Sequence, residues 1–438
     1  MNKRFDERWT CEGDWTPAVS RRALLGGGAL AAVWWAARGT ALADLSLGDQ
    51  PDPTGDLLVV VFLRGGADGM NMVAPVGADA YHRARPTLAL ARATDRTAPK
   101  ADRVLDLDGF FGLNPAMGPL LPLYREGRLG FVHACGSGDH TRSHFEAMAA
   151  MERGNENIRG GIASGWLARH LDARPQKGAS PLRAVAFSSV MPDSLRGATS
   201  AMALESLADF RLRLPEGPEN RGGRLRQTLT RLYQDQLRDP IVDAGVETFK
   251  LLETLNRLDP AHYKPESGAA YPDSELGRGL RQVAFLAKAR VGLEVAFLDR
   301  GGWDTHVAQG SSTGYMALGL TDVSDSLAAF AKDLGPALDR TTVVVMTEFG
   351  RRLQENSGLG TDHGRGSVMT VLGGGTQGGR VHAKWPGLEP HELDEVGDLR
   401  VTTDYRDVLA EILDKRVRST NLAAVFPGHT PKALGVVQ

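Results

Sequence analysis

The sequence Gly301-Gly302-Trp303-Asp304-Thr305-His306 follows an apolar run, Leu293–Leu298, that has the pattern of a buried strand. Asp304 and His306 would therefore emerge where a strand ends, and in an open α/β sheet ligands bind at that edge. A carboxylate and an imidazole two residues apart are a usual pair of ligands for a divalent metal ion. The alternative is that Asp304 caps a turn while His306 is solvated.

Two further apolar runs have the same relation to acidic side chains. Asp56–Leu63 leads through an Arg-Gly-Gly turn to Asp68, and Thr341–Thr347 leads directly to Glu348, with His363 in the loop beyond. Continuous β-branched runs are typical of strands buried on both faces of a parallel sheet. Because amphipathic helices alternate with these strands, the sequence predicts an α/β fold built from parallel β-α-β units.

Composition restricts the class of protein. The chain has 438 residues, 42% of them hydrophobic and 24% charged, which is the balance of an ordinary soluble protein. Lys and Arg number 51 against 53 Asp and Glu, for a net charge of −2, so no nucleic-acid partner is expected. From about residue 204 to 276 the sequence becomes charged and helical and carries no chemical motif, which predicts a helical insertion.

The N-terminus has the pattern of an export signal. Ser20-Arg21-Arg22 is a twin-arginine motif, followed by the apolar segment Ala23–Ala37 and the small-x-small site Ala41-Leu42-Ala43. We expect residues 1–43 to be a signal peptide, cleaved after Ala43, that engages the twin-arginine export machinery and delivers residues 44–438 to the periplasm. The alternative is an uncleaved anchor, but the apolar run is shorter than the ~20 residues that a spanning helix needs. No membrane span is expected after cleavage.

A further strand, Leu129–Ala134, leads to a candidate anion site. Ser143 followed by Glu146 fits a capping box, so a helix is expected to begin there. A helix N-terminus offers free N–H groups to an anion, and Arg142 adds a cation. The hydroxyl of Ser143 or Thr141 is then a candidate nucleophile towards a phosphate or sulfate ester. The alternative is that Ser143 only caps the helix.

Six motifs occur in a fixed order between about Asp56 and Phe426: Phe62-Leu63-Arg64-Gly65-Gly66-Ala67-Asp68-Gly69, Arg142-Ser143-His144-Phe145, Asp304-Thr305-His306, Glu348-Phe349-Gly350-Arg351, Thr361-Asp362-His363-Gly364 and Thr403-Asp404-Tyr405-Arg406. With the twin-arginine leader, this order resembles the exported bacterial domain-of-unknown-function family 1501, which is grouped with the alkaline phosphatase and sulfatase superfamily. The resemblance implies a doubly wound, mostly parallel sheet of the alkaline phosphatase-like type, with metal ions at one edge.

The resemblance also implies roles for individual residues. A divalent ion (zinc, calcium or manganese) would be held by five side chains, and the nucleophile would lie at the helix start: Asp68, Asp304, His306, Glu348 and His363 for the metal, and Thr141, Arg142 and Ser143 for the chemistry. The chain departs from the pattern where metal-dependent members carry Asp-His, because it has Glu348-Phe349 there. One well-held ion is therefore expected in place of two.

Two functions remain open from the sequence. The first is a periplasmic metal-dependent hydrolase of a small anionic phosphate or sulfate ester, in which Arg142 and also Arg64 or Arg365 bind the anion. The second is a non-catalytic protein on the same fold that binds a metal or an anion or serves in assembly. An oxidoreductase is disfavoured, because no dinucleotide fingerprint opens a helix and no cysteine cluster is present.

Overall fold

The computed structural model describes residues 56–155, 162–175, 180–208, 252, 255, 259–394 and 397–438. Its centre is a nine-stranded sheet in the order β13-β5-β12-β9-β1-β8-β6-β7, with β14 also paired to β5. The strands are β1 (Leu57–Leu63), β5 (Leu129–Gly136), β6 (Ala184–Phe187), β7 (Ala201–Leu204), β8 (Val295–Arg300), β9 (Thr341–Thr347), β12 (Ser367–Gly373), β13 (Val381–His382) and β14 (Thr403–Asp404).

The sheet is mostly parallel, as predicted. Strands β7, β6, β8, β1 and β9 pair in parallel, while β12 runs antiparallel to both of its neighbours, β9 and β5. Because β12 is antiparallel to both of these strands, β5 runs in the same direction as β9. Every parallel strand therefore ends at the same edge.

Strand β1 has side chains buried on both faces of the sheet. Leu57, Val59, Val61 and Leu63 belong to one apolar cluster, whereas the alternate residues Leu58, Val60 and Phe62 belong to another. A strand has a side-chain period of two, so a continuous apolar run fills both faces. Each fully buried side chain of this kind contributes roughly 1.5–3 kcal/mol, which makes β1 a central element of the core.

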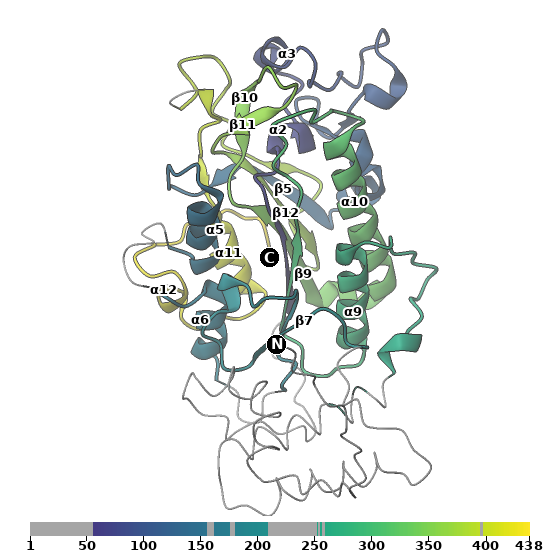
Figure 1. Cartoon of the computed structure of the whole chain (residues 1–438), viewed down its shortest axis with the longest axis vertical. Coiled ribbons are helices and arrows are strands. Elements are labelled where there is room, and N and C mark those ends of the chain that lie inside the picture. The colour runs from purple at the N-terminus through teal and green to yellow at the C-terminus, as the bar shows by residue number, and fades with distance from the viewer. Residues whose placement is uncertain are drawn as a thin grey trace, which may run out of the picture.

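Helices cover both faces, which makes the sheet doubly wound (Figure 1). α9 and α10 lie on one side, and α5, α6, α11 and α12 lie on the other. The described helices are α2 (Gly69–Met72), α3 (Asp79–Ala84), α4 (Leu121–Arg125), α5 (His144–Arg153), α6 (Trp166–Ala173), α9 (Glu275–Lys288), α10 (Tyr315–Leu334), α11 (Tyr405–Lys415) and α12 (Leu422–Val425), with 3-10 turns at 100–102, 115–120, 193–195, 260–262 and 335–340.

Two small sheets accompany the main sheet. β2 (Val73–Ala74), β4 (Gly112–Leu113) and β3 (Leu105–Asp106) form one. β10 (Arg351–Glu355) and β11 (Thr361–His363) form an antiparallel hairpin directly after β9, and Arg351 pairs with His363. This hairpin brings the Asp362-His363 segment back over the edge where β9 ends.

The expected signal peptide, residues 1–43, lies outside the described residues, as does most of the expected insertion at about 204–276. The described end of that insertion holds a 3-10 turn, Pro260–His262, and a loop that continues to α9. Within the described ranges, no helix is both long enough and apolar enough to cross a membrane.

Candidate metal centre

The ends of three neighbouring strands are level at the carboxyl edge. Leu63 of β1 pairs with Arg300 of β8 on one side and with Thr347 of β9 on the other. The segments that follow these residues therefore leave the sheet side by side. This register places the loop that carries Asp304 next to the loop that carries Glu348.

Three histidines converge on the carboxylate of Asp304. Its Oδ1 atom lies 3.0 Å from Nε2 of His306, 3.1 Å from Nε2 of His363 and 3.4 Å from Nε2 of His144. The Nε2 atoms of His306 and His363 are 2.9 Å apart. Two ligands of a tetrahedral zinc ion, each ~2.0–2.1 Å from the metal, are about 3.3 Å apart, so these spacings are close to those of a metal's ligands.

The opposite ring nitrogen of each histidine faces an oxygen acceptor. Nδ1 of His144 lies 2.7 Å from Oε1 of Glu348, and Nδ1 of His306 lies 3.2 Å from Oδ1 of Asp362. Nδ1 of His363 lies 2.8 Å from the carbonyl oxygen of residue 142. Since carbonyls and carboxylates accept, a neutral ring keeps its hydrogen on Nδ1 and presents the Nε2 lone pair to the cluster.

Lone pairs that face one another need a cation or a proton between them. Nε2 of His144 is buried and has no hydrogen-bond partner in the part of the chain that the structure describes. Buried polar atoms are rarely left in that state. His144, Asp304 and His363 form a group able to hold a metal ion, and His306 adjoins both Asp304 and His363. We call these four residues the metal cluster.

Arg351 holds the carboxylate in place. This fully buried guanidinium donates to Oδ1 of Asp304 at 2.8 Å and also to the carbonyls of Gly66, Trp303 and Thr361. Burial by itself raises the pKa of Asp304, but the hydrogen bond and positive charge of Arg351, together with the nearby imidazoles, outweigh it and lower the pKa to about 2. Asp304 is therefore ionised at neutral pH.

Glu348 lies behind the cluster. Its buried carboxylate accepts the Gly65 N–H at 2.8 Å and the Thr347 hydroxyl at 3.0 Å, in addition to facing His144. The hydrogen bond to Glu348 is the main reason why the pKa of His144 is raised, although burial opposes it. Glu348, predicted as a metal ligand, thus faces the Nδ1 atom of His144, the side of the ring away from Asp304.

Asp68 is not brought into the cluster. Its oxygens lie 2.5 and 3.1 Å from the guanidinium of Arg85, and Nε2 of Gln309 donates to it at 2.7 Å. The side chains of Asp68 and Arg85 are fully buried, so a fixed cation already neutralises this carboxylate. Gln309 also accepts from the hydroxyls of Thr305 at 2.8 Å and Thr361 at 2.6 Å, and it thereby ties the two ligand loops together.

The helix start lies where the sequence predicted it, but its hydrogen bonds differ. Ser143 is the N-cap residue of α5, yet its side chain makes no cap hydrogen bond. The Thr141 hydroxyl instead donates to Glu146 at 2.7 Å and accepts the Ser143 N–H at 3.2 Å. The capping-box interpretation of Ser143 is therefore wrong, because its side chain makes no cap bond and Thr141 binds the Ser143 N–H and the Glu146 carboxylate, which a capping box would join directly.

The arginines expected to bind an anion all have carboxylate partners. Arg142 donates to Asp398 at 2.6 Å, and Arg64 donates to Glu152 at 2.8 Å and to Asp299 at 2.6 Å. Arg365 pairs with Asp394. These pairs fix the loops around the cluster but leave their positive charge largely neutralised.

Two residues of the site, His144 and Asp362, were not predicted as such from the sequence. Both lie inside quoted motifs, next to Ser143 and His363. His144 opens α5, which follows β5, so the shared edge of parallel strands was a signal that could have found it. Asp362 had no comparable signal, because its contact with His306 depends on how the β10–β11 hairpin folds back.

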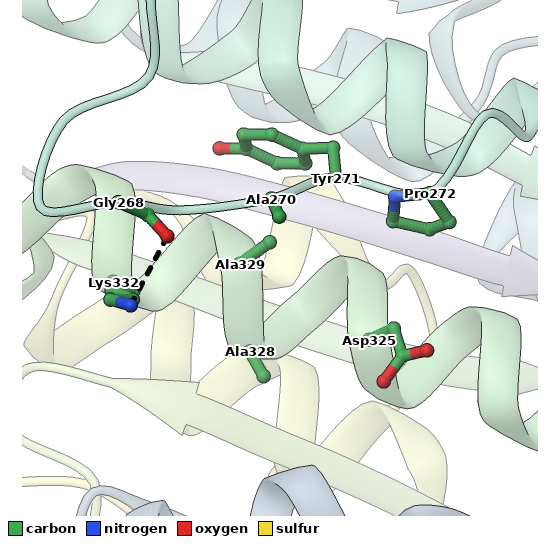
Figure 2. A pocket seen from close by; sticks show the side chains of 8 residues that line it. All are labelled: Gly268, Ala270, Tyr271, Pro272, Asp325, Ala328, Ala329 and Lys332. Atoms are coloured by element: carbon green, nitrogen blue, oxygen red, sulfur yellow. Dashed lines mark hydrogen bonds between the residues drawn. The ribbon is translucent and has the colours of Figure 1, made fainter.

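A cavity of about 360 Å³ lies away from this cluster, between the loop before α9 and the second half of α10 (Figure 2). Asp325 and Lys332, which line it, are 10 and 17 residues beyond Tyr315 along α10, or roughly 15 and 25 Å at the rise of an α-helix. None of the predicted site residues lines it. The lining consists of Gly268, Ala270, Tyr271, Pro272, Asp325, Ala328, Ala329 and Lys332.

Residues 56–426 match the model of the family described as "Protein of unknown function (DUF1501)". No curated protein matches the sequence. Among solved structures, the chain is similar to the C-terminal periplasmic domain of EcEptC from Escherichia coli in complex with Zn, with 9% identity, coverage of 90% of this chain and 92% of that chain, and a TM-score of 0.37.

Two other solved structures are similar at the same level. Phosphonate monoester hydrolase of Agrobacterium radiobacter has 12% identity, coverage of 85% of this chain and 78% of that chain, and a TM-score of 0.31. A mutant of TAB5 alkaline phosphatase with Mg bound has 11% identity, coverage of 73% and 91%, and a TM-score of 0.29. Since these TM-scores are below 0.5, the site is interpreted from its own geometry.

Proposed function

We propose that this chain, which belongs to the family described as "Protein of unknown function (DUF1501)", is an exported metal-dependent hydrolase of a phosphate or sulfate ester. One divalent ion would be held by His144, Asp304, His306 and His363. The observation that carries the proposal is the convergence of three Nε2 atoms on one carboxylate oxygen, with every Nδ1 atom anchored by an acceptor.

The donor set favours zinc among the three metals expected from the sequence. Three imidazoles and one carboxylate match the nitrogen and oxygen ligands of zinc sites, and manganese is the next best fit. Calcium is disfavoured, because it takes six to eight oxygen ligands. An ion bound there would polarise an ester oxygen and stabilise negative charge on the transferred group.

The chain's own residues supply the other parts of the chemistry. The Ser143 hydroxyl, free of a cap hydrogen bond, would attack phosphorus or sulfur, so that a new ester bond forms while the bond to the alcohol breaks. The Ser143 proton ends on the departing alcohol, and water then hydrolyses the serine ester. The first turn of α5 leaves backbone N–H groups without intrahelical acceptors, and these would bind the anion's oxygens.

The test is turnover by metal-loaded protein. We expect hydrolysis of an aryl phosphate or an aryl sulfate that is lost on chelation, restored by zinc or manganese and abolished by Ser143→Ala. Folded, metal-loaded protein that turns over neither ester would contradict the proposal.

A second candidate function is favoured by one observation. Arg64, Arg142 and Arg365 are each paired with carboxylates, so these cations are not available to stabilise a reacting ester, which suits a non-catalytic protein that binds a metal, or an anion through that metal, in an assembly. In that case phosphate or sulfate would raise the melting temperature of the loaded protein without any turnover.

A further inference from the structure

The described surface exposes six large apolar side chains, and four of them belong to or contact the segments that carry the proposed metal ligands. Their exposed fractions range from 54% to 84%: Phe145, Val190, Val307, Tyr315, Leu318 and Leu359. Single exposed apolar residues are normal when they are scattered over a surface. Four of them around one cluster of polar residues are characteristic of a binding site.

Two of these side chains adjoin metal ligands directly. Phe145, the most exposed at 84%, follows His144 in the first turn of α5, and Val307, 73% exposed, follows His306. Phe145 and Val307 are therefore the exposed apolar side chains that directly follow two of the proposed ligands in the chain.

Two more lie in or against the loops that hold these ligands. The carbonyl oxygen of Leu359 accepts the Gln309 N–H at 2.9 Å, which places the 356–360 turn against the segment after His306. The Tyr315 hydroxyl lies over Gly302, where an added Cβ would meet it at 3.2 Å. We call Phe145, Val307, Tyr315 and Leu359 the apolar collar.

The other two exposed apolar side chains lie farther from the ligands. Leu318 is one turn after Tyr315 on α10. Val190 follows the end of β6, whose last residue, Phe187, pairs with Leu298 of β8. Val190 is therefore at the same edge of the sheet but is not adjacent to any residue of the cluster, which makes it a matched control for Val307.

The charges near the cluster support an apolar partner for the collar. The arginines that flank the cluster are engaged by carboxylates, as described for Arg64, Arg142 and Arg365. At the carboxyl edge of the sheet, the metal ligands and the N-terminus of α5 can therefore bind one anionic group. The collar offers apolar contact to the rest of the molecule that carries this group.

We propose that the ligand is an amphiphilic ester, whose phosphate or sulfate group reaches the metal cluster while its hydrocarbon or aryl part lies against Phe145 and Val307. This inference rests on the proposed function, because it names the substrate class of the same site. The collar discriminates between esters by contact area alone, so longer chains are hydrolysed more efficiently until the collar is covered.

The test compares alkyl sulfates and alkyl phosphates of increasing chain length, below their micelle concentrations, as substrates of the zinc-loaded protein. We expect kcat/KM to rise by up to about fourfold for each methylene that becomes buried. Phe145→Ser with Val307→Ser flattens this dependence, whereas Val190→Ser leaves it unchanged. All of these side chains are exposed, so the variants keep the parent's melting temperature.

A binding measurement separates this inference from the proposed function. Decanesulfonate cannot be hydrolysed, and we expect it to bind the zinc-loaded protein at least tenfold more tightly than methanesulfonate does, with the preference lost in Phe145→Ser. If no ester is turned over but this preference is found, the hydrolase proposal fails and the ligand class stands.

Other outcomes overturn the inference. Hydrolysis that is indifferent to chain length would leave the enzyme proposal in place and remove the amphiphile. If the collar variants instead abolish self-association in sedimentation or binding to anionic vesicles, with no chain-length effect, the collar contacts a second copy or a membrane and the inference is wrong.

Discussion

The Nε2 atoms of His306 and His363 lie 2.9 Å apart, each with its Nδ1 atom facing an oxygen acceptor. Two neutral imidazoles in this arrangement direct lone pairs at one another, which is unfavourable unless a cation or proton lies between them. Their backbones come from different segments, the loop after β8 and strand β11, so the fold holds them together against this repulsion.

Removing both imidazoles tests the metal site directly. We expect the parent protein to carry about one divalent ion per chain and His306→Ala with His363→Ala to lose it. At a metal concentration a hundredfold above Kd, the bound ion stabilises the native state by about 2.7 kcal/mol, so the double variant should melt several degrees lower. His262→Ala, at a histidine that is 84% exposed, is the control. Equal metal content in all three proteins would refute the site.

Metal uptake should release a proton from His144. The hydrogen bond to Glu348 raises the pKa of His144 above its ordinary 6.5, so this ring is partly protonated near neutral pH and must lose its proton to bind a metal. Calorimetry in buffers of different ionisation enthalpy measures the release at pH 7. Glu348→Gln should reduce the release, and an unchanged value in that variant would contradict the assignment.

The hydrogen-bonded pair of His144 and Glu348 should also affect the stability of the metal-free protein. Because its pKa is raised on folding, His144 contributes stability that is fully present below about pH 6.5 and is lost as the pH rises through the raised value. Unfolding of chelated protein at several pH values checks this sign. The Glu348→Gln variant should show a smaller dependence in that range.

Ser143 and Thr141 should respond in opposite ways to replacement by alanine. Since the Ser143 side chain makes no cap bond, Ser143→Ala should cost less than about 0.5 kcal/mol while abolishing ester hydrolysis. Thr141→Ala removes the hydroxyl that binds Glu146 and the Ser143 N–H, and should cost about 1 kcal/mol with activity retained. Chemical denaturation and initial rates distinguish the two, and a Ser143→Ala protein that stays active would exclude the serine as nucleophile.

Asp68→Asn should destabilise the protein without removing the metal. Breaking a fully buried ion pair leaves Arg85 without its counter-charge and typically costs about 3–5 kcal/mol. Arg83→Ala breaks an exposed pair with Glu389 and should cost less than about 1 kcal/mol. Loss of the metal from folded Asp68→Asn protein would show instead that Asp68 is a ligand.

Replacing Arg21 and Arg22 by lysine tests export. The expectation is that unprocessed precursor then accumulates in the cytoplasm, because the twin-arginine pair is the recognised feature of the signal. Fractionation followed by mass determination measures processing after Ala43. Mature double variant in the periplasm would show that another route is used.

Much of the fold was predictable from local patterns. The continuous apolar run of β1 predicted a strand buried on both faces, and the repeated order of strands and helices predicted the mostly parallel sheet. The motif order predicted the family, which the match over residues 56–426 confirms. The rule that parallel strands end at one edge places Asp304 and His306 there, whereas the β10–β11 hairpin brings His363 to them.

The sequence by itself thus determined which segments are buried and which polar residues follow them, because burial leaves a periodic signature in the chain. Only the tertiary structure decided which partner each polar side chain has. Asp68 follows a strand just as Glu348 does, yet the carboxylate of Asp68 pairs with Arg85 whereas that of Glu348 faces His144. That choice depends on contacts between segments as far apart as Gly65 and Glu348, which are set by strand register and loop packing and leave no periodic trace along the chain.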